Sequence, residues 1–89
     1  MKVDEAAAAD IIRRLRRAEG QIRGVIGMIE AGRECSEIVT QLAAVSRAID
    51  RAGFRVISSG LEQCMNSDVD DSTRKADLEQ MEKLFLSLA

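Results

Sequence analysis

Two cysteines, Cys35 and Cys64, are the residues of this sequence best suited to covalent or metal chemistry. The chain contains no histidine, so neither an imidazole base nor an imidazole metal ligand is available. A free cysteine is often only a small buried hydrophobic side chain, and that interpretation stays open here. The alternative is a pair of sensor thiols that react with thiol-reactive or thiophilic ligands.

Both cysteines fall in one segment whose apolar residues recur at steps of four and three, which predicts a helix from about Glu34–Ser36 to Met65. On a straight helix they lie on similar faces, but roughly 43 Å apart at 1.5 Å per residue. They therefore cannot meet within one helix. If a second copy of the helix pairs antiparallel with the first, Cys35 of each chain comes near Cys64 of the other, twice per dimer.

The two thiols are expected to differ in chemistry. Cys35 lies at a helix N-terminus beside Arg33, where the helix dipole and a cation favour the thiolate, although Glu34 and Glu37 oppose this effect. Cys64 lies near the C-terminus of the same helix, where the dipole disfavours the anion. We predict that Cys35 is the first nucleophile and Cys64 the resolving thiol.

Arginines form a second group of chemically competent residues. The net charge of −2 conceals a basic stretch at residues 13–23 and an acidic one at residues 62–82. Few acidic residues stand four positions away to neutralise these arginines, so they can meet phosphates, although a merely solvated face is the alternative. No helix-turn-helix is evident, and Gln21 and Gln41 have no assigned partner. The arginines concerned are Arg13, Arg14, Arg16, Arg17 and Arg23, followed by Arg47, Arg51 and Arg55.

The elements that must position these groups are helices. A first stripe predicts a helix from about Val3 or Asp4 to Ala31, with Gly32 as its stop. Glycines inside it suggest close approach of a partner, and Gly53 and Gly60 are weak points of the second helix, at which a bend is allowed. Asp71, Ser72 or Thr73 is expected to cap a third helix. The first stripe is Ile11, Leu15, Ala18, Ile22, Val25 and Ile29; the second is Ile38, Leu42, Val45, Ile49, Ala52 and Val56; the third helix carries Leu78, Met81, Leu84, Phe85 and Leu88.

The sequence thus predicts an all-α fold with one domain over residues 1–89. A chain of 89 residues buries a modest core, so we expect the long antiparallel hairpin of the first two helices to pair as a four-helix-bundle dimer. The short third helix would cover an end or form a further interface. No signal peptide and no apolar run of about 20 residues is present, so we expect a cytoplasmic protein without a membrane partner.

The block from Arg14 to Gly24 resembles the signature of the CsoR/RcnR family of metal- and sulfur-responsive repressors. The resemblance continues through residues 28–30, Cys35, residues 39–45 and Cys64. It implies a homodimer of hairpins that assembles into a homotetramer and binds operator DNA without a conventional recognition helix. It also implies that Arg14 and Arg51 contact DNA, and we extend this expectation to Arg16 and Arg17.

Within this family, copper sensors use a cysteine together with a His-x-x-x-Cys pair from the partner chain. Gly60 stands at the position of that histidine, and Glu34 and Gln80 replace a tyrosine and a glutamate of the copper sensors. Nickel and cobalt sensors need several histidines, and formaldehyde sensors need an N-terminal proline that this chain lacks. The chain is most similar to the CstR-type branch, in which persulfide or polysulfide creates inter-chain di- to tetrasulfide links and operator DNA is released.

We therefore expect a repressor induced by reactive sulfur species, with Cys35 and Cys64 as sensor thiols and no cofactor. The alternative is a Cu(I) sensor that binds copper through the same cysteines, with Met65 as a soft third ligand. An enzyme is not expected, because histidine, aromatic pockets and a phosphate loop are all missing. A structural adaptor would explain the apolar stripes but not the arginines or the thiols.

Overall fold

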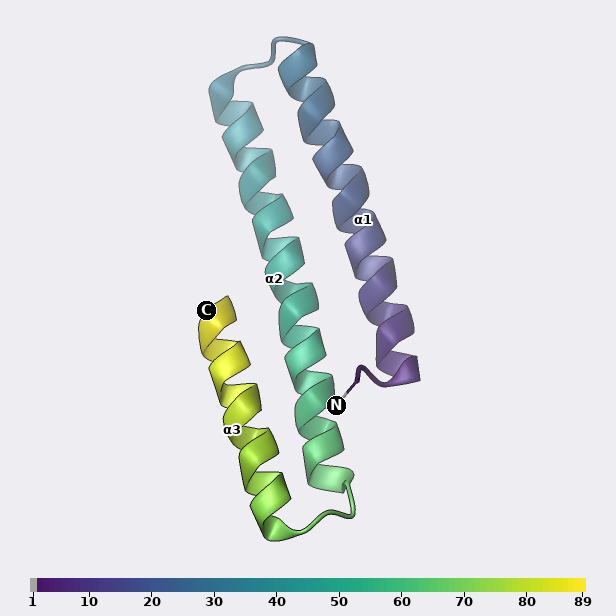
Figure 1. Cartoon of the computed structure of the whole chain (residues 1–89). Coiled ribbons are helices and arrows are strands. Elements are labelled where there is room, and N and C mark those ends of the chain that lie inside the picture. Colours follow the sequence, from purple (N-terminus) through teal and green to yellow (C-terminus); the bar gives the residue numbers. More distant parts are fainter. Residues whose placement is uncertain (1) are drawn as a thin grey trace.

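The computed structural model describes residues 2–89 and contains three helices joined by short connections. They are α1 (Glu5–Glu30), α2 (Cys35–Asn66) and α3 (Asp71–Leu88). Helices α1 and α2 form a long antiparallel hairpin, and α3 turns back along the second half of α2 (Figure 1). No strand occurs within residues 2–89, so the predicted all-α fold and its hairpin are confirmed.

The helix ends follow local chemistry. Gly32 has a φ of 71°, a left-handed conformation that stops the first helix as predicted. The cap of α3 differs from the expectation of Asp71, Ser72 or Thr73, because the Asp70 carboxylate accepts the Thr73 backbone N–H at 2.7 Å. The same carboxylate accepts the Ser72 hydroxyl at 3.0 Å, which leaves Asp71 as the first helical residue.

Each apolar stripe of the hairpin is divided between two roles. Alternate members lie in the α1–α2 seam. Five of them are at most 6% exposed: Ile11, Ala18 and Val25 on α1, and Val45 and Ala52 on α2. The sixth, Ile38, is half-buried. The members between them remain 39–58% exposed: Leu15, Ile22 and Ile29 on α1, and Leu42, Ile49 and Val56 on α2. An apolar residue exposed at every seventh position is typical of a seam that faces a further helix.

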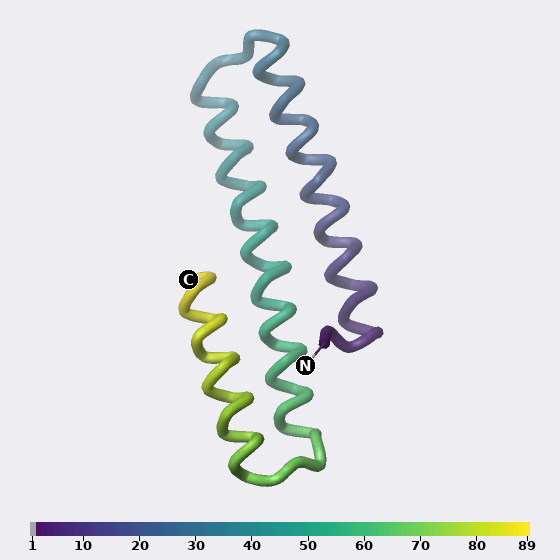
Figure 2. Tube along the Cα trace, in the orientation of Figure 1, coloured from purple at the N-terminus to yellow at the C-terminus, as the bar shows by residue number. Residues whose placement is uncertain are grey.

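The molecule is a single layer of helices. Helix α2 lies in the middle, and within residues 2–89 helices α1 and α3 each pack on α2 but not on each other (Figure 2). The Cα atoms extend 57 × 24 × 12 Å, and their radius of gyration is 17.2 Å. A compact domain of this length would have a radius of gyration of about 12 Å.

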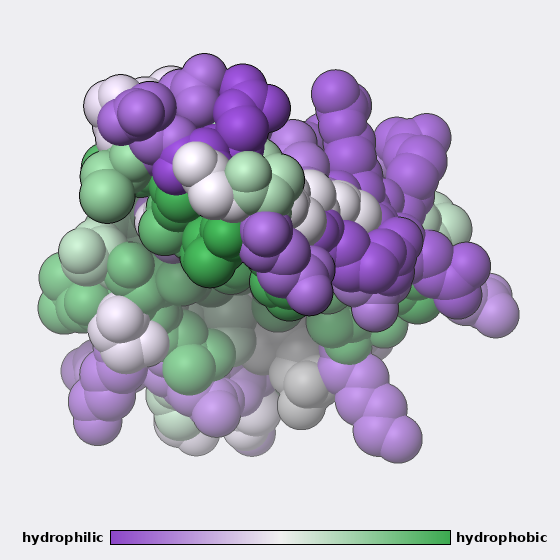
Figure 3. All heavy atoms as spheres, turned by 90° about the horizontal axis from the view of Figure 1, so that it is seen from above, coloured by the Kyte–Doolittle hydropathy of each residue, from purple (hydrophilic) through white to green (hydrophobic). Residues whose placement is uncertain are grey.

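This thin shape leaves apolar side chains at the surface. The accessible surface is 6676 Å², whereas a folded monomer of this mass would expose about 5,200 Å². Viewed along its length, the molecule shows apolar side chains reaching the surface between the charged ones (Figure 3). In the described part of the chain no helix is long and apolar enough to cross a membrane.

Helix α3 rests on two glycines of α2. A Cβ at Gly53 would lie 2.6 Å from Leu88 Cδ2, and a Cβ at Gly60 would lie 2.5 Å from Met81 Sδ. Phe54 and Phe85 pair between these contacts, with ring centroids 5.5 Å apart. The sequence suggested a bend in α2 at one of these glycines; the helix is continuous through both, and both make room for α3.

Candidate nucleic-acid interface and thiol sites

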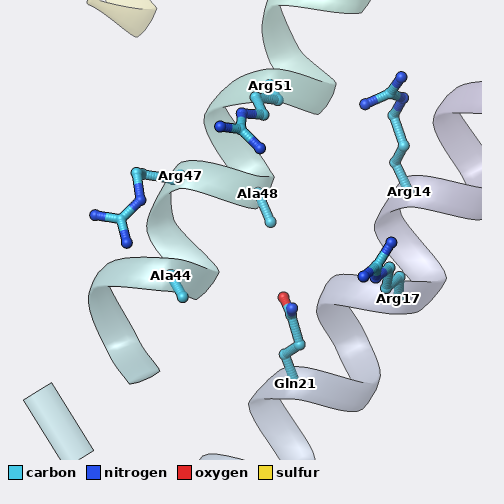
Figure 4. A pocket seen from close by; sticks show the side chains of 7 residues that line it. All are labelled: Arg14, Arg17, Gln21, Ala44, Arg47, Ala48 and Arg51. Atoms are coloured by element: carbon cyan, nitrogen blue, oxygen red, sulfur yellow. The ribbon is translucent and has the colours of Figure 1, made fainter. Parts of the chain in front are cut away.

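A groove lined by arginines runs between α1 and α2. We call it the arginine groove; it has a volume of about 360 Å³ and is lined by Arg14, Arg17, Gln21, Ala44, Arg47, Ala48 and Arg51. Arg14 and Arg17 project from α1, whereas Arg47 and Arg51 project from α2 (Figure 4). The two alanines keep the floor open because a longer side chain there would fill it. The structure therefore brings cations of both helices to one concave surface, which suits a phosphate group.

Three of the expected DNA-contacting residues meet in this groove, and the fourth does not. Arg14, Arg17 and Arg51 line it, but Arg16 lines a different depression with Ile12, Leu15 and Glu19. Arg47 also lines the groove, although it was not among the residues expected to contact DNA. Its spacing of four residues from Arg51 was the signal that places both on one face.

Gln21 extends from α1 into the gap between the helices (Figure 4). Its Oε1 atom is buried and has no hydrogen-bond partner among residues 2–89, so within this part of the chain the groove holds an unsatisfied acceptor beside its cations. Buried acceptors are normally paired, which makes this atom a candidate for pairing with a bound donor. The sequence identified Gln21 as a polar residue without a partner, and its burial became visible only in the fold.

Asp10 is a residue that the sequence patterns did not reveal. Its carboxylate binds Arg13, accepts the Arg14 Nε–H at 2.9 Å, and lies 3.7 Å from Arg55 Nε on α2. Hydrogen bonds from Arg14 and Arg13 hold the pKa of the Asp10 carboxyl below its ordinary value. The expectation that few acids neutralise these arginines therefore needs correction, because one carboxylate engages three of them. Its positions three and four residues before Arg13 and Arg14 were the available signal.

The two thiols lie at opposite ends of α2. Cys35 is the first residue of the helix and is exposed, whereas Cys64 lies in the last turn and is 1% exposed. Because α2 is one continuous helix, the distance along its axis between them is roughly 43 Å. They are too far apart to react with each other within one chain, as the sequence predicts.

The cation beside Cys35 is already engaged. Arg33 donates to the Glu37 carboxylate through Nε at 3.0 Å and through Nη2 at 2.8 Å. This pairing raises the pKa of Arg33 and lowers the pKa of Glu37. Glu37 also accepts the backbone N–H of Glu34 at 3.3 Å, which ties it to the start of the helix. Any activation of Cys35 therefore depends on its exposure and the helix N-terminus more than on Arg33.

Cys64 lies in a contact between α2 and α3. Its carbonyl oxygen accepts Arg74 Nε–H at 3.2 Å and the Ser67 hydroxyl at 3.3 Å. Met81, the one residue of α3 that is buried, has its sulfur over Gly60, one helical turn before Cys64. Met65, which the sequence offered as a soft ligand, is 69% exposed.

The donors available for a metal ion are few. Among residues 2–89 no three His, Cys, Asp or Glu side chains are grouped so that they could hold a metal ion. The donors that fit a soft metal are the thiols and the thioethers, and the thiols lie at opposite ends of α2. A site for such a metal would therefore need a second copy of the chain, a thioether, or both.

Comparison with known proteins identifies the family. The profile of the metal-sensitive transcriptional repressors matches residues 7–87, which include the arginine groove, both cysteines and most of α3. The chain belongs to this family. The sequence-based resemblance to CsoR/RcnR repressors is thereby confirmed, and the regulator interpretation is supported over the enzyme one.

Individual relatives agree with this assignment. The chain is 35% identical over 65 residues to the copper-sensing transcriptional repressor RicR of Mycobacterium tuberculosis, covering 73% of this chain and 68% of RicR. It is 34% identical over 70 residues to the copper-sensing transcriptional repressor CsoR of Bacillus subtilis, covering 79% of this chain and 65% of that protein. Its fold matches the nickel-responsive transcriptional regulator InrS with a TM-score of 0.77 and 27% identity over 91% of each chain.

Proposed function

We propose that this family member represses transcription by binding operator DNA, and that reaction of Cys35 with Cys64 of a second copy releases the DNA. The observation that carries the DNA-binding half is the arginine groove, where four arginines from two helices surround one concave surface. Such a surface neutralises phosphates and gives an affinity that falls steeply with salt. Operator DNA is the polyanion that a transcriptional repressor meets.

The functional unit is proposed to be a homodimer of hairpins, two of which form a homotetramer. Support comes from the exposed half of each apolar stripe. It also comes from the accessible surface of 6676 Å², because a compact monomer of this mass would expose about 5,200 Å². A second hairpin packed on this face would complete a four-helix bundle. In an antiparallel arrangement it would also bring Cys35 of one copy beside Cys64 of the other.

The proposed inducer is a reactive sulfur species, that is, a persulfide or polysulfide. The Cys35 thiolate attacks the terminal sulfur of a persulfide R–S–SH, which forms Cys35–S–SH and releases R–S⁻. The Cys64 thiolate of the second copy then attacks the Cys35 sulfur, and HS⁻ leaves with the electron pair, so that a disulfide links the chains. A trisulfide forms when the Cys35 persulfide attacks the inner sulfur of a Cys64 persulfide and HS⁻ leaves, and a Cys64 side chain that carries one more sulfane sulfur gives the tetrasulfide in the same way. The exposed thiol at position 35 and the buried one at position 64 suit this order of events.

The test combines intact mass spectrometry with DNA binding. The protein is treated anaerobically with polysulfide and added to the labelled DNA upstream of its own gene. We expect covalent dimers that carry zero to two added sulfurs, together with loss of the DNA complex. The single variants C35S and C64S should bind DNA like the unmodified protein, yet fail to form the link or release the DNA. If the protein retards none of this DNA at low salt, the repressor proposal is wrong.

Cu(I) is a second candidate inducer, favoured by relatives that are named copper-sensing repressors. Thiolates are soft ligands that select Cu(I), and Cys35 with Cys64 of a second copy would supply two of them. An anaerobic Cu(I) titration of the same DNA complex distinguishes the candidates. Copper that binds stoichiometrically and releases DNA without covalent dimers supports this candidate, whereas covalent dimers formed only with polysulfide support the first.

A further inference from the structure

Two sulfur-bearing side chains share the contact between α2 and α3. Gly60 and Cys64 stand four residues apart on α2, so they lie on the same face about 6 Å apart along the axis. The Met81 sulfur lies 2.5 Å from the position that a Cβ at Gly60 would occupy. Both Cys64 and Met81 are withdrawn from solvent, with exposures of 1% and 7%.

The missing side chain at Gly60 is what admits this sulfur. A glycine within a helix costs up to about 1 kcal/mol relative to alanine, so its presence in α2 calls for a reason. Any larger residue would force the Met81 sulfur away from the helix. At the other end of the same contact, the aliphatic carbons of Leu88 pack over Gly53. A leucine is therefore sufficient where a glycine of α2 needs only a packing partner. Beside the buried thiol, the seated atom is a thioether sulfur instead.

The position of α3 relative to Cys64 is fixed by hydrogen bonds. Arg74, in the first turn of α3, donates to the Cys64 carbonyl at 3.2 Å and to the Ser67 carbonyl at 2.9 Å. Met81 follows Arg74 by seven residues, so both lie on the face of α3 that meets α2. The thioether is therefore held near the thiol end of α2 rather than swinging freely.

We propose that Met81 Sδ and Cys64 Sγ form a pair of soft ligands for Cu(I), completed by Cys35 of a second copy. Thiolate and thioether are the donors that select Cu(I), and no group of three His, Cys, Asp or Glu within residues 2–89 offers a competing hard site. This chain has no histidine to act as a third ligand, and Met81 of α3 would take that place. The inference rests on the dimer of the proposed function and deepens its copper candidate.

The first experiment compares Cu(I) affinities of M81L and M65L by anaerobic titration against a competing Cu(I) chelator. Leucine keeps the apolar volume of Met81 but removes its sulfur. We expect M81L to weaken Cu(I) binding by about tenfold or more, the scale of a lost contributor to a metal site. The comparison variant M65L removes the exposed methionine that the sequence offered as the rival third ligand; under this proposal it leaves the affinity unchanged, and a loss in M65L but not in M81L would overturn it. Equal affinity of M81L and the unmodified protein would overturn the proposal.

A second measurement needs no change of packing. The protein is prepared with selenomethionine, loaded anaerobically with Cu(I), and studied by X-ray absorption at the copper and selenium edges. A copper–selenium contact that is present in this protein and in M65L, and absent in M81L, supports Met81 as the ligand. A copper environment of sulfur alone contradicts it, even if M81L should fold poorly.

The two readouts separate this inference from the proposed function. If Cu(I) or polysulfide releases DNA but no selenium contacts copper, the repressor remains and Met81 is only a packing residue. If copper contacts selenium in a protein that never binds DNA, the ligand assignment holds and the repressor proposal fails. The variant G60A provides a further check, because its new methyl group displaces the Met81 sulfur. It should weaken Cu(I) binding as M81L does, and an unchanged affinity would count against the proposal.

Discussion

At the scale of single residues, Asp10 limits how many charges the basic surface can offer. Its carboxylate holds Arg13 and Arg14 of α1 and lies near Arg55 of α2. A DNA phosphate must compete with this carboxylate for the same guanidinium groups. Asp10 therefore acts as an internal substitute for phosphate, and it positions Arg14 at the edge of the arginine groove.

Replacing Asp10 with asparagine should strengthen DNA binding, because the substitution frees these arginines without changing the size of the side chain. We expect the affinity for DNA to rise a few-fold. The plot of the logarithm of the DNA association constant against the logarithm of salt concentration should become steeper by about 0.9 for each additional phosphate that the protein neutralises. Fluorescence anisotropy with labelled DNA over a series of salt concentrations measures both. A weaker complex would mean that Asp10 is needed to hold Arg14 in its binding position.

Replacing Arg47 with alanine should weaken DNA binding about equally for all sequences and lower the salt slope by about 1, as for loss of one phosphate contact. Arg33 provides the matched control, since it lies outside the arginine groove and is paired with Glu37. The variant R33A should bind DNA like the unmodified protein. Equal losses in both variants would indicate a diffuse charge effect in place of a defined groove.

The sequence offered candidate site residues through their chemical type and through the family resemblance, but it did not reveal contacts between distant residues. The two thiols stood out by cysteine chemistry, Arg14 and Arg51 came from the resemblance to CsoR/RcnR repressors, and Arg17 was an extension of it. Met81 looked like an ordinary member of an apolar stripe. The place of its sulfur depends on α3 folding back onto Gly60, a contact between residues distant in the chain.

At the scale of the elements, α3 is held by a cap, a pair of hydrogen bonds and two glycine contacts. The sequence predicted this helix but placed its cap one to three residues too late, because several adjacent polar residues satisfy the same preference. The direction in which α3 leaves α2 was not predictable either. It depends on Arg74 reaching the end of α2, which only the connection at residues 67–70 permits.

The cap of α3 should make its stability depend on pH. The Thr73 backbone N–H lowers the pKa of Asp70 below its ordinary value of 3.8. A carboxyl whose pKa is lower when folded contributes stability above its unfolded pKa, and loses it as pH falls through the folded pKa. We therefore expect D70A to lower Tm by a few degrees at pH 7.

The difference in Tm between D70A and the unmodified protein should disappear once the pH falls well below the lowered pKa of Asp70, because protonation of the carboxyl removes the same interaction. Thermal unfolding followed by circular dichroism from neutral to strongly acidic pH measures this. As a control, D68A alters a carboxyl outside the cap and should change Tm little at any pH. A difference for D70A that persists after full protonation of the carboxyl would contradict the assignment of Asp70 as an ionised cap.

At the scale of the whole molecule, the exposed half of the apolar stripes is the face through which the proposed dimer would assemble. Replacing Leu42, which is 49% exposed, with glutamate puts a charge into the proposed interface between hairpins. We expect this variant to remain helical but to form smaller species, and to lose DNA binding. Sedimentation velocity and circular dichroism measure size and helicity, and the anisotropy assay measures DNA binding.

The control for assembly is L86E, which changes an equally apolar residue of α3 that is 63% exposed and outside both stripes. It should sediment like the unmodified protein. If L42E keeps the original size, the hairpins pair through another face, and the proposed inter-chain thiol pairs are then wrong as well.

The continuous α2 with one thiol at each end also has a consequence for the response of the proposed dimer to its proposed inducer. Antiparallel pairing generates two identical reaction centres, related by a two-fold axis and separated by roughly the 43 Å between the thiols. A dimer can therefore carry no link, one link or two, and the half-reacted form lacks the symmetry of the other two. The response of transcription to inducer dose then depends on which of these three stoichiometric forms still holds DNA, so the arrangement of two thiols on one helix sets the shape of a dose–response curve.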